Sequence, residues 1–137
     1  MSHTVHPYSH RLGILRDWKS RWFSPKGKFK EYLEADVVIR RYLEKKLKGF
    51  FIADIEIERS QKALRIILST SRPGMIIGRA GDGSQKLLAD VKKLLEKKKL
   101  LPAKVELKLD VKEVKSPESN AAIVAEMVVE GLEKRMP

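Results

Sequence analysis

Three glycines within six positions, Gly78, Gly81 and Gly83, limit the possible folds of this chain more than any other feature. They follow a short apolar turn at Met75–Ile77. Glycine adopts backbone conformations that a Cβ atom disfavours, so such a cluster allows a tight turn between two helices. Beyond the glycines, apolar residues recur with the spacing of one helix face, at Leu87, Leu88, Val91, Leu94 and Leu95. The sequence therefore predicts a short helix, a glycine loop and a long helix in succession.

The other segments show either helical or strand-like hydrophobic patterns. Residues 31–48 have helical spacing and end at Gly49, a residue that commonly stops a helix. Alternating apolar and polar residues predict three strands, at residues 51–58, 64–68 and 104–112. The short turn at residues 60–62 indicates that the first two strands form a hairpin. Ser116-Pro117 resembles an N-cap followed by proline, and it predicts a last helix that begins there. Together these patterns predict an α+β fold, with a three-stranded sheet packed against helices and an extra C-terminal helix.

Positive charge is concentrated in the first part of the chain. The 137 residues hold 29 Lys and Arg against 18 Asp and Glu, a formal net charge of +11. Residues 1–30 hold seven of these basic residues and one acid, and they include Trp18, Trp22 and Phe23 among the cations. We therefore divide the chain into an irregular basic arm, residues 1–30, and a folded domain, residues 31–137. The excess of cations predicts a polyanionic partner, with nucleic acid favoured over an anionic membrane.

Several functional classes are disfavoured by composition. The chain contains no cysteine, which excludes disulfide scaffolds, thiol nucleophiles and zinc fingers built on cysteine. Its apolar runs are far shorter than the roughly 18 residues of a membrane span. Residues 31–48 could lie on an anionic membrane, but Glu34, Asp36 and Glu44 argue against it. We expect a cytoplasmic protein without a membrane partner.

The element order and the loop Gly78-Arg79-Ala80-Gly81 resemble a KH domain of type II, which carries a GxxG loop at this place. This resemblance implies that the loop backbone holds sugar-phosphate while an adjacent apolar groove accepts about four unpaired bases. The RNA-binding residues it implies here are Ile77, Gly78, Arg79, Ala80, Gly81 and Lys86. KH loops usually carry an aliphatic residue where this chain has Ser84, so we expect a differently packed helix start or a serine cap.

The arm resembles the N-terminal signature of the universal small-subunit ribosomal protein S-three family. The matching motifs are Val5-His6-Pro7, Arg11-Leu12-Gly13-Ile14 and Asp17-Trp18-Lys19-Ser20-Arg21-Trp22-Phe23, followed by Ser71-Arg72-Pro73-Gly74 and Leu132-Glu133-Lys134-Arg135. Where many members have glycine and an aromatic residue before the Arg-Leu-Gly-Ile run, this chain has Ser9 and His10. Members of the family continue into a second α/β domain.

The S-three resemblance implies a structural protein of the ribosome. It implies binding to small-subunit ribosomal RNA in the head, near the place where messenger RNA enters, beside neighbouring head proteins. Messenger RNA is a further candidate partner, and no catalytic residue, metal or cofactor is implied. The RNA-binding residues assigned on this basis are His6, Arg11, Arg16, Trp18, Lys19, Arg21, Trp22 and Arg72.

Four alternatives remain open at this point. The domain could be a free-standing KH module that binds single-stranded RNA in ribosome assembly or RNA regulation, or it could process nucleic acid as an enzyme. The arm aromatics could stack on unpaired bases or anchor the arm to its own domain. His3, His6 and His10 could hold a metal, although no second ligand cluster accompanies them.

Overall fold

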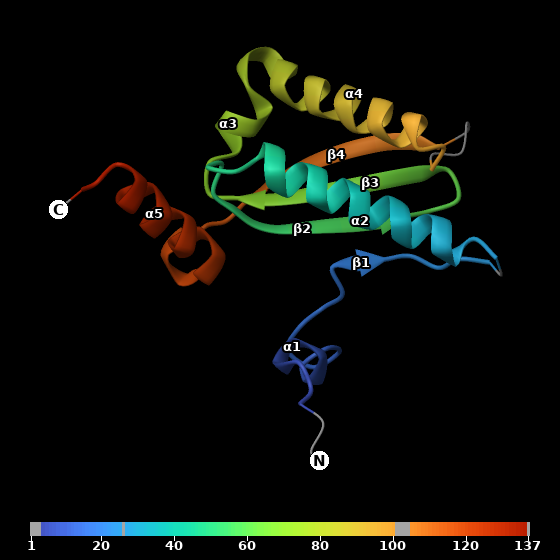
Figure 1. Ribbon diagram of the computed structural model, residues 1–137, viewed down its shortest axis with the longest axis horizontal. Helices are drawn as coiled ribbons and strands as arrows, with labels where there is room; N and C mark the ends of the chain where they lie inside the picture. The colour runs from blue at the N-terminus through green and yellow to red at the C-terminus, as the bar shows by residue number, and fades with distance from the viewer. Residues whose placement is uncertain (1–3, 26, 101–104, 137) are drawn as a thin grey trace.

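A computed structural model describes residues 4–25, 27–100 and 105–136. Its sheet is built on the predicted hairpin, β2 (Ile52–Arg59) and β3 (Ala63–Thr70), which pair antiparallel. β4 (Glu106–Glu113) runs parallel to β3 along its whole length. A short strand from the arm, β1 (Ser20–Arg21), pairs parallel with β2 and completes the order β1-β2-β3-β4 (Figure 1). The three predicted strands are confirmed, except that Lys104 lies outside the described residues.

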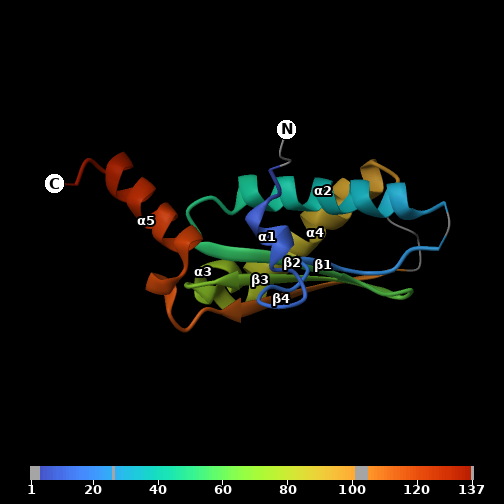
Figure 2. The same cartoon turned by 90° about the horizontal axis from the view of Figure 1, so that it is seen from below.

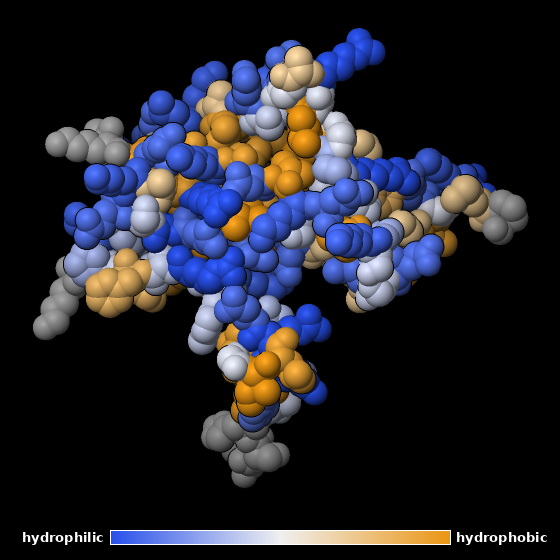
Figure 3. All heavy atoms as spheres, turned by 180° about the vertical axis from the view of Figure 1, so that it is seen from behind, coloured by the Kyte–Doolittle hydropathy of each residue, from blue (hydrophilic) through white to orange (hydrophobic). Residues whose placement is uncertain are grey.

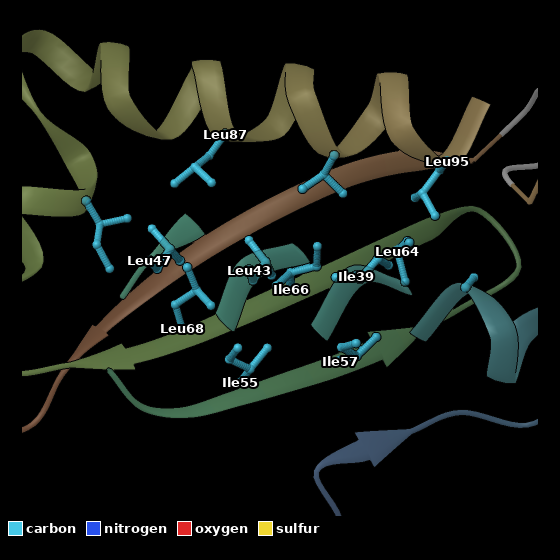
Figure 4. Close-up of a cluster of buried hydrophobic side chains, with 13 residues drawn as sticks. Ile39, Leu43, Leu47, Ile55, Ile57, Leu64, Ile66, Leu68, Leu87 and Leu95 are labelled. Carbon is cyan, nitrogen blue, oxygen red and sulfur yellow. The ribbon is translucent and has the colours of Figure 1, made fainter. Parts of the chain in front are cut away.

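Two long helices cover one face of this sheet (Figure 2). They are α2 (Phe29–Lys46) and α4 (Asp82–Lys97), and each presents an apolar stripe to the strands. Figure 4 shows Leu87 and Leu95 of α4 pointing toward the side chains of the sheet. Burial of each leucine or isoleucine in this layer stabilises the fold by about 1.5–3 kcal/mol. The side chains that form it include Ile39, Leu43, Ile57, Leu64, Ile66, Leu68, Val91 and Leu95.

The last helix, α5 (Ala121–Glu133), begins later than the sequence predicts. Pro117–Ser119 form a separate 3-10 turn, and no side-chain cap bond is made by Ser116. Asn120 caps the helix instead, because its backbone is extended and its side-chain oxygen accepts hydrogen bonds from Ala122 N (3.0 Å) and Ile123 N (3.4 Å). The prediction of Ser116 as the N-cap is therefore wrong. The reason is that the proline turn is completed before the helix starts.

The arm is more regular than expected. It contains α1 (Pro7–His10), and its β1 makes the sheet four-stranded instead of three-stranded. The Ile57 N–H donates to the Lys19 carbonyl at 2.9 Å. Arg40 of α2 fixes the same segment, since its guanidinium donates to the Lys19 carbonyl and to Ser20 Oγ, both at 2.8 Å. The C-terminal part of the arm is thus held against the domain, and the division near residue 30 stays a prediction.

Within the described ranges, no helix is both long and apolar enough to cross a bilayer.

Candidate nucleic-acid interface

The glycine loop lies between α3 (Pro73–Ile77) and α4, where the chain reverses through a 3-10 turn at Arg79–Gly81. Three loop residues have positive φ: Gly78 at +71°, Ala80 at +52° and Gly81 at +85°. Gly78, Arg79 and Ala80 are exposed. The loop therefore presents backbone to solvent, with the Arg79 cation beside it.

The third glycine of the cluster, Gly83, determines how closely the two helices approach. A Cβ atom at Gly83 would lie 2.5 Å from the Ile76 carbonyl oxygen and 3.0 Å from that of Ile77. Such a contact is impossible without moving α3 away from α4, so position 83 requires glycine for packing. The sequence analysis counted this glycine but did not assign it that role, and its position just inside a predicted helix was the available signal.

The first turn of α4 faces the loop without a side-chain cap. The N-cap is Gly81, and no side chain among the described residues caps it. Ser84 does not act as a cap, because its hydroxyl donates to the Gly81 carbonyl at 2.8 Å. The Asp82 N–H donates to the Arg79 carbonyl, whereas the following N–H groups of the first turn have no partner within the helix. These groups and the positive end of the helix dipole favour an anion at this position. The exposed Arg79 and Lys86 add positive charge, whereas Asp82 in the first turn opposes it.

An apolar groove lies between α4 and the start of β4, and it begins about two helical turns along α4 from the loop. Its lining includes Leu88, Ala89 and Leu107, with Lys92 and Glu106 at its sides, around a cavity of about 260 Å³. Viewed from behind, apolar side chains form a band over this face, bordered by hydrophilic ones (Figure 3). Ile77, at the end of α3, is 39% exposed. The arrangement offers an apolar surface next to a site for anions.

Three of the arm residues predicted to bind RNA contact their own domain, namely Arg21, Trp22 and, through its ion pair with Asp54, Lys19. Arg21 forms ion pairs with Asp17 (2.7 Å), Glu56 (2.6 Å) and Glu58 (2.9 Å). The Trp18 backbone N–H and the Arg21 guanidinium together hold the pKa of Asp17 below its ordinary value of 3.8. The Trp22 indole packs 5.4 Å from the Phe29 ring centroid and 5.8 Å from that of Tyr32. In the structure, Trp22 therefore anchors the arm to its own domain.

The other arm residues remain exposed. His6 caps α1 by accepting the Tyr8 N–H at 3.2 Å, and Arg11 donates to the Pro7 carbonyl at 2.8 Å. Arg16 lies over the Tyr8 ring at 5.9 Å from its centroid. Trp18 is 59% exposed. Lys19, which pairs with Asp54, is exposed as well. This group forms a basic and aromatic surface on the arm.

The predicted site residues thus divide between two surfaces. The arm leaves the sheet at its β1 edge, whereas α3 and α4 contact β4 at the opposite edge (Figure 1). Arg72 belongs to the second surface: it precedes α3 and stacks on Phe51 at 4.2 Å from the ring centroid. His3 lies outside the described residues, and within those residues no three His, Asp or Glu side chains gather around a metal-sized space.

These features agree with the comparisons to known proteins. A family model described as KH domain matches residues 38–119, more than half of the chain. The chain belongs to the KH domain family, and its α+β architecture with the GxxG loop confirms the predicted fold.

The relatives are ribosomal. The chain is 43% identical to small ribosomal subunit protein uS3 of Caldicellulosiruptor bescii over 136 residues, which is 99% of this chain and 58% of that protein. It is 41% identical to the uS3 protein of Xanthomonas oryzae pv. oryzae, over 99% of this chain and 52% of the relative. It is 38% identical to the uS3 protein of Clostridium perfringens, over 99% of this chain and 58% of that protein. The predicted resemblance to the S-three family is confirmed, and the chain spans a little over half the length of these relatives.

Proposed function

We propose that this protein is a structural component of the small ribosomal subunit that binds small-subunit ribosomal RNA. The observation that carries the proposal is the uncapped first turn of α4 at the exposed loop beside Arg79, with the apolar groove further along the same helix. Backbone N–H groups at such a helix start hold phosphate, and the groove accommodates unpaired bases. Similarity to uS3 proteins over nearly the whole chain favours this function over a free-standing KH module.

The arm forms the second contact in this proposal. Its exposed cations and Trp18 project from the β1 edge, while Arg21, Trp22 and Arg40 hold the root of the arm against the domain. A basic segment fixed in this way loses less conformational entropy on binding than a free tail. Contact with messenger RNA and with neighbouring head proteins, and a place in the cytoplasmic ribosome, belong to the same proposal.

A double substitution in the loop tests the anion site. Replacing Arg79 and Ala80 by Asp puts negative charge beside the proposed phosphate position, and Asp tolerates the positive φ of position 80. We expect affinity for a short unpaired oligonucleotide to fall about tenfold or more, because neighbouring phosphates are repelled. Fluorescence anisotropy measures the affinity, and circular dichroism verifies the fold.

A matched control changes the net charge equally on α2. Replacing Arg41 by Asn and Lys45 by Asp lowers the net charge by the same three units on exposed positions. If both double variants lose affinity to the same degree, only overall charge matters and the loop is not the binding site.

Deleting residues 4–16 tests the arm while leaving β1 and Trp22 in place. We expect the truncated protein to lose affinity for folded small-subunit RNA and to keep its affinity for the short oligonucleotide. Equal losses on both RNAs would contradict separate roles for arm and groove.

A further inference from the structure

A third surface lies at the end of the molecule where β2 turns into β3. A cavity of about 550 Å³ opens there between the arm and the hairpin turn. Its lining includes Phe23, Pro25, Lys28, Tyr32, Arg59 and Gln61. None of the site residues assigned from the sequence belongs to it.

Phe23 is the unusual side chain of this cavity. It is 88% exposed, although the neighbouring Trp22 is packed against the domain. An aromatic ring held at the mouth of a cavity by a fixed neighbour is available for stacking, and it loses little entropy when a planar group binds.

The back wall of the cavity is rigid and positively charged. The Arg59 guanidinium stacks on Tyr32 at 4.4 Å from the ring centroid and pairs with Asp36 at 3.2 Å. Its side chain is 4% exposed, and its Nε finds no hydrogen-bond acceptor among the described residues. The buried pair with Asp36 therefore fixes the guanidinium and the Tyr32 ring in one position at this wall.

The remaining lining groups select the chemical class of the ligand. Lys28 is an exposed ammonium, Gln61 carries an amide at the turn, and the described residues that line the cavity include no acid. The Phe23 ring can stack on a nucleotide base, the Gln61 amide can hydrogen-bond to the edge of that base, and the Lys28 ammonium can pair with a phosphate. An apolar or acidic peptide would satisfy the ring or the cation but would not use all three.

This cavity is well separated from the glycine loop. β3 begins next to the hairpin turn and ends just before α3, and its eight residues span about 25 Å. The apolar groove between α4 and β4 leads toward the cavity, because Val105 lines both. A ligand of about four nucleotides held at the glycine loop would fill this groove, and a longer strand would continue to Phe23.

We infer that the cavity beside Phe23 binds one unpaired nucleotide of the same RNA strand or fold that occupies the glycine loop. The inference rests on the RNA binding proposed above and adds a second, separate base-binding position. It makes the domain a two-point clamp, with one contact at each end of β3.

The test compares oligonucleotides of two lengths, one of about four uridines that fills only the groove and one about three times as long. Phe23→Leu keeps an apolar side chain but removes the aromatic ring, and Phe23→Trp keeps a ring. We expect Phe23→Leu to weaken binding of the longer oligonucleotide about 5- to 100-fold and to leave binding of the shorter one unchanged. Phe23→Trp should bind like the wild type, and Leu132→Ala, at a 73% exposed position on α5, serves as the control.

A second measurement maps the contact directly. The longer oligonucleotide with 4-thiouridine is crosslinked to the wild-type protein, and mass spectrometry should locate adducts at Phe23 or Lys28. Wild-type affinity of Phe23→Leu for the longer oligonucleotide, without an adduct in the cavity, overturns the inference and leaves the proposed function intact. Failure of the wild type to bind either oligonucleotide overturns both.

Discussion

The Trp22 indole Nε1 donates a hydrogen bond to Asp36 Oδ2 at 2.6 Å, across the boundary between arm and domain. The other carboxylate oxygen of Asp36 accepts from Arg59 Nη2 at 3.2 Å. Asp36 lies on α2 and is only 3% exposed. A single buried carboxylate therefore joins the arm, a helix and strand β2.

Removing this carboxylate should destabilise the protein strongly. Asp36→Ala leaves the buried Arg59 guanidinium without its counter-ion, and we expect a loss of about 3–5 kcal/mol in the free energy of unfolding. Trp22→Phe keeps most of the ring packing but loses one hydrogen bond to a charged acceptor, so it should cost about 1.5–3 kcal/mol. Urea unfolding measures both. A loss below about 1 kcal/mol for Asp36→Ala would mean that the pair behaves like an exposed one.

The contact at Gly83 leads to a comparison of two glycines. Gly83→Ala places a Cβ atom 2.5 Å from the Ile76 carbonyl oxygen, and α3 must shift away from α4. We expect a loss of about 1–3 kcal/mol, as for other overpacked sites, together with weaker RNA binding. Gly74→Ala is the control, because it lies in α3 with no atom within 4 Å of the added Cβ. It should leave stability unchanged or raise it by up to about 1 kcal/mol. Equal thermal midpoints of the two variants would contradict the packing role of Gly83.

Asp82 should limit the affinity of the loop for RNA. Its carboxylate lies in the first turn of α4, where it stabilises the helix but repels a phosphate bound at the same N–H groups. Asp82→Asn should raise affinity for a short oligonucleotide about two- to fivefold and lower the thermal midpoint slightly. Glu118→Gln, an exposed acid in the 3-10 turn before α5, controls for the change in net charge. Weaker binding of Asp82→Asn would show that the carboxylate helps to position the loop.

The elements with a clear hydrophobic period could be predicted from the sequence, because burial on one face fixes the pattern of an entire strand or helix. In α4 the buried residues Leu87, Val91 and Leu95 follow the helical period. In β3, Leu64, Ile66 and Leu68 follow the period of two, but Ile67 on the other face is buried as well. β1 could not be predicted in the same way. It has two residues, and its place depends on Arg40 and on a free edge of β2 that only the folded sheet provides.

The position of the glycine loop could be predicted from the sequence, because backbone conformation determines it. The partners of the charged side chains could not be predicted in the same way. Gly78 and Gly81 lie in the loop as expected, since positive φ favours glycine whatever surrounds it. A cation such as Arg21 can face RNA or the carboxylates of its own chain, and its partners Glu56 and Glu58 come from a distant strand. The alternation that places both acids on the outer face of β2 was the available signal.

An ion pair between the two long helices should make stability depend on pH at both extremes. Lys46 of α2 donates to Asp90 of α4, and the pair is exposed. The Lys46 ammonium holds the pKa of Asp90 below its ordinary value of 3.8, and the Asp90 carboxylate raises the pKa of Lys46 above 10.5. Because the folded-state pKa of Asp90 is lowered, the stabilisation is complete above 3.8 and disappears as the pH falls through the lowered value. Because the folded-state pKa of Lys46 is raised, the stabilisation by the pair is complete below pH 10.5 and disappears as the pH rises through the raised pKa.

We expect the wild type to be more stable than Asp90→Asn. The difference in their free energies of unfolding should be constant from about pH 5 to pH 9 and should shrink below and above this range. High salt should reduce this difference, since the pair is exposed to solvent. The pair of Arg65 with Asp110 is the control, because a guanidinium stays charged in alkali. Asp110→Asn should therefore keep its effect at the alkaline limit, where Lys46 deprotonates. Denaturant unfolding at a series of pH values measures these differences, and an effect of Asp90→Asn that persists unchanged through both limits would show that the carboxylate stabilises the fold by packing instead of by its charge.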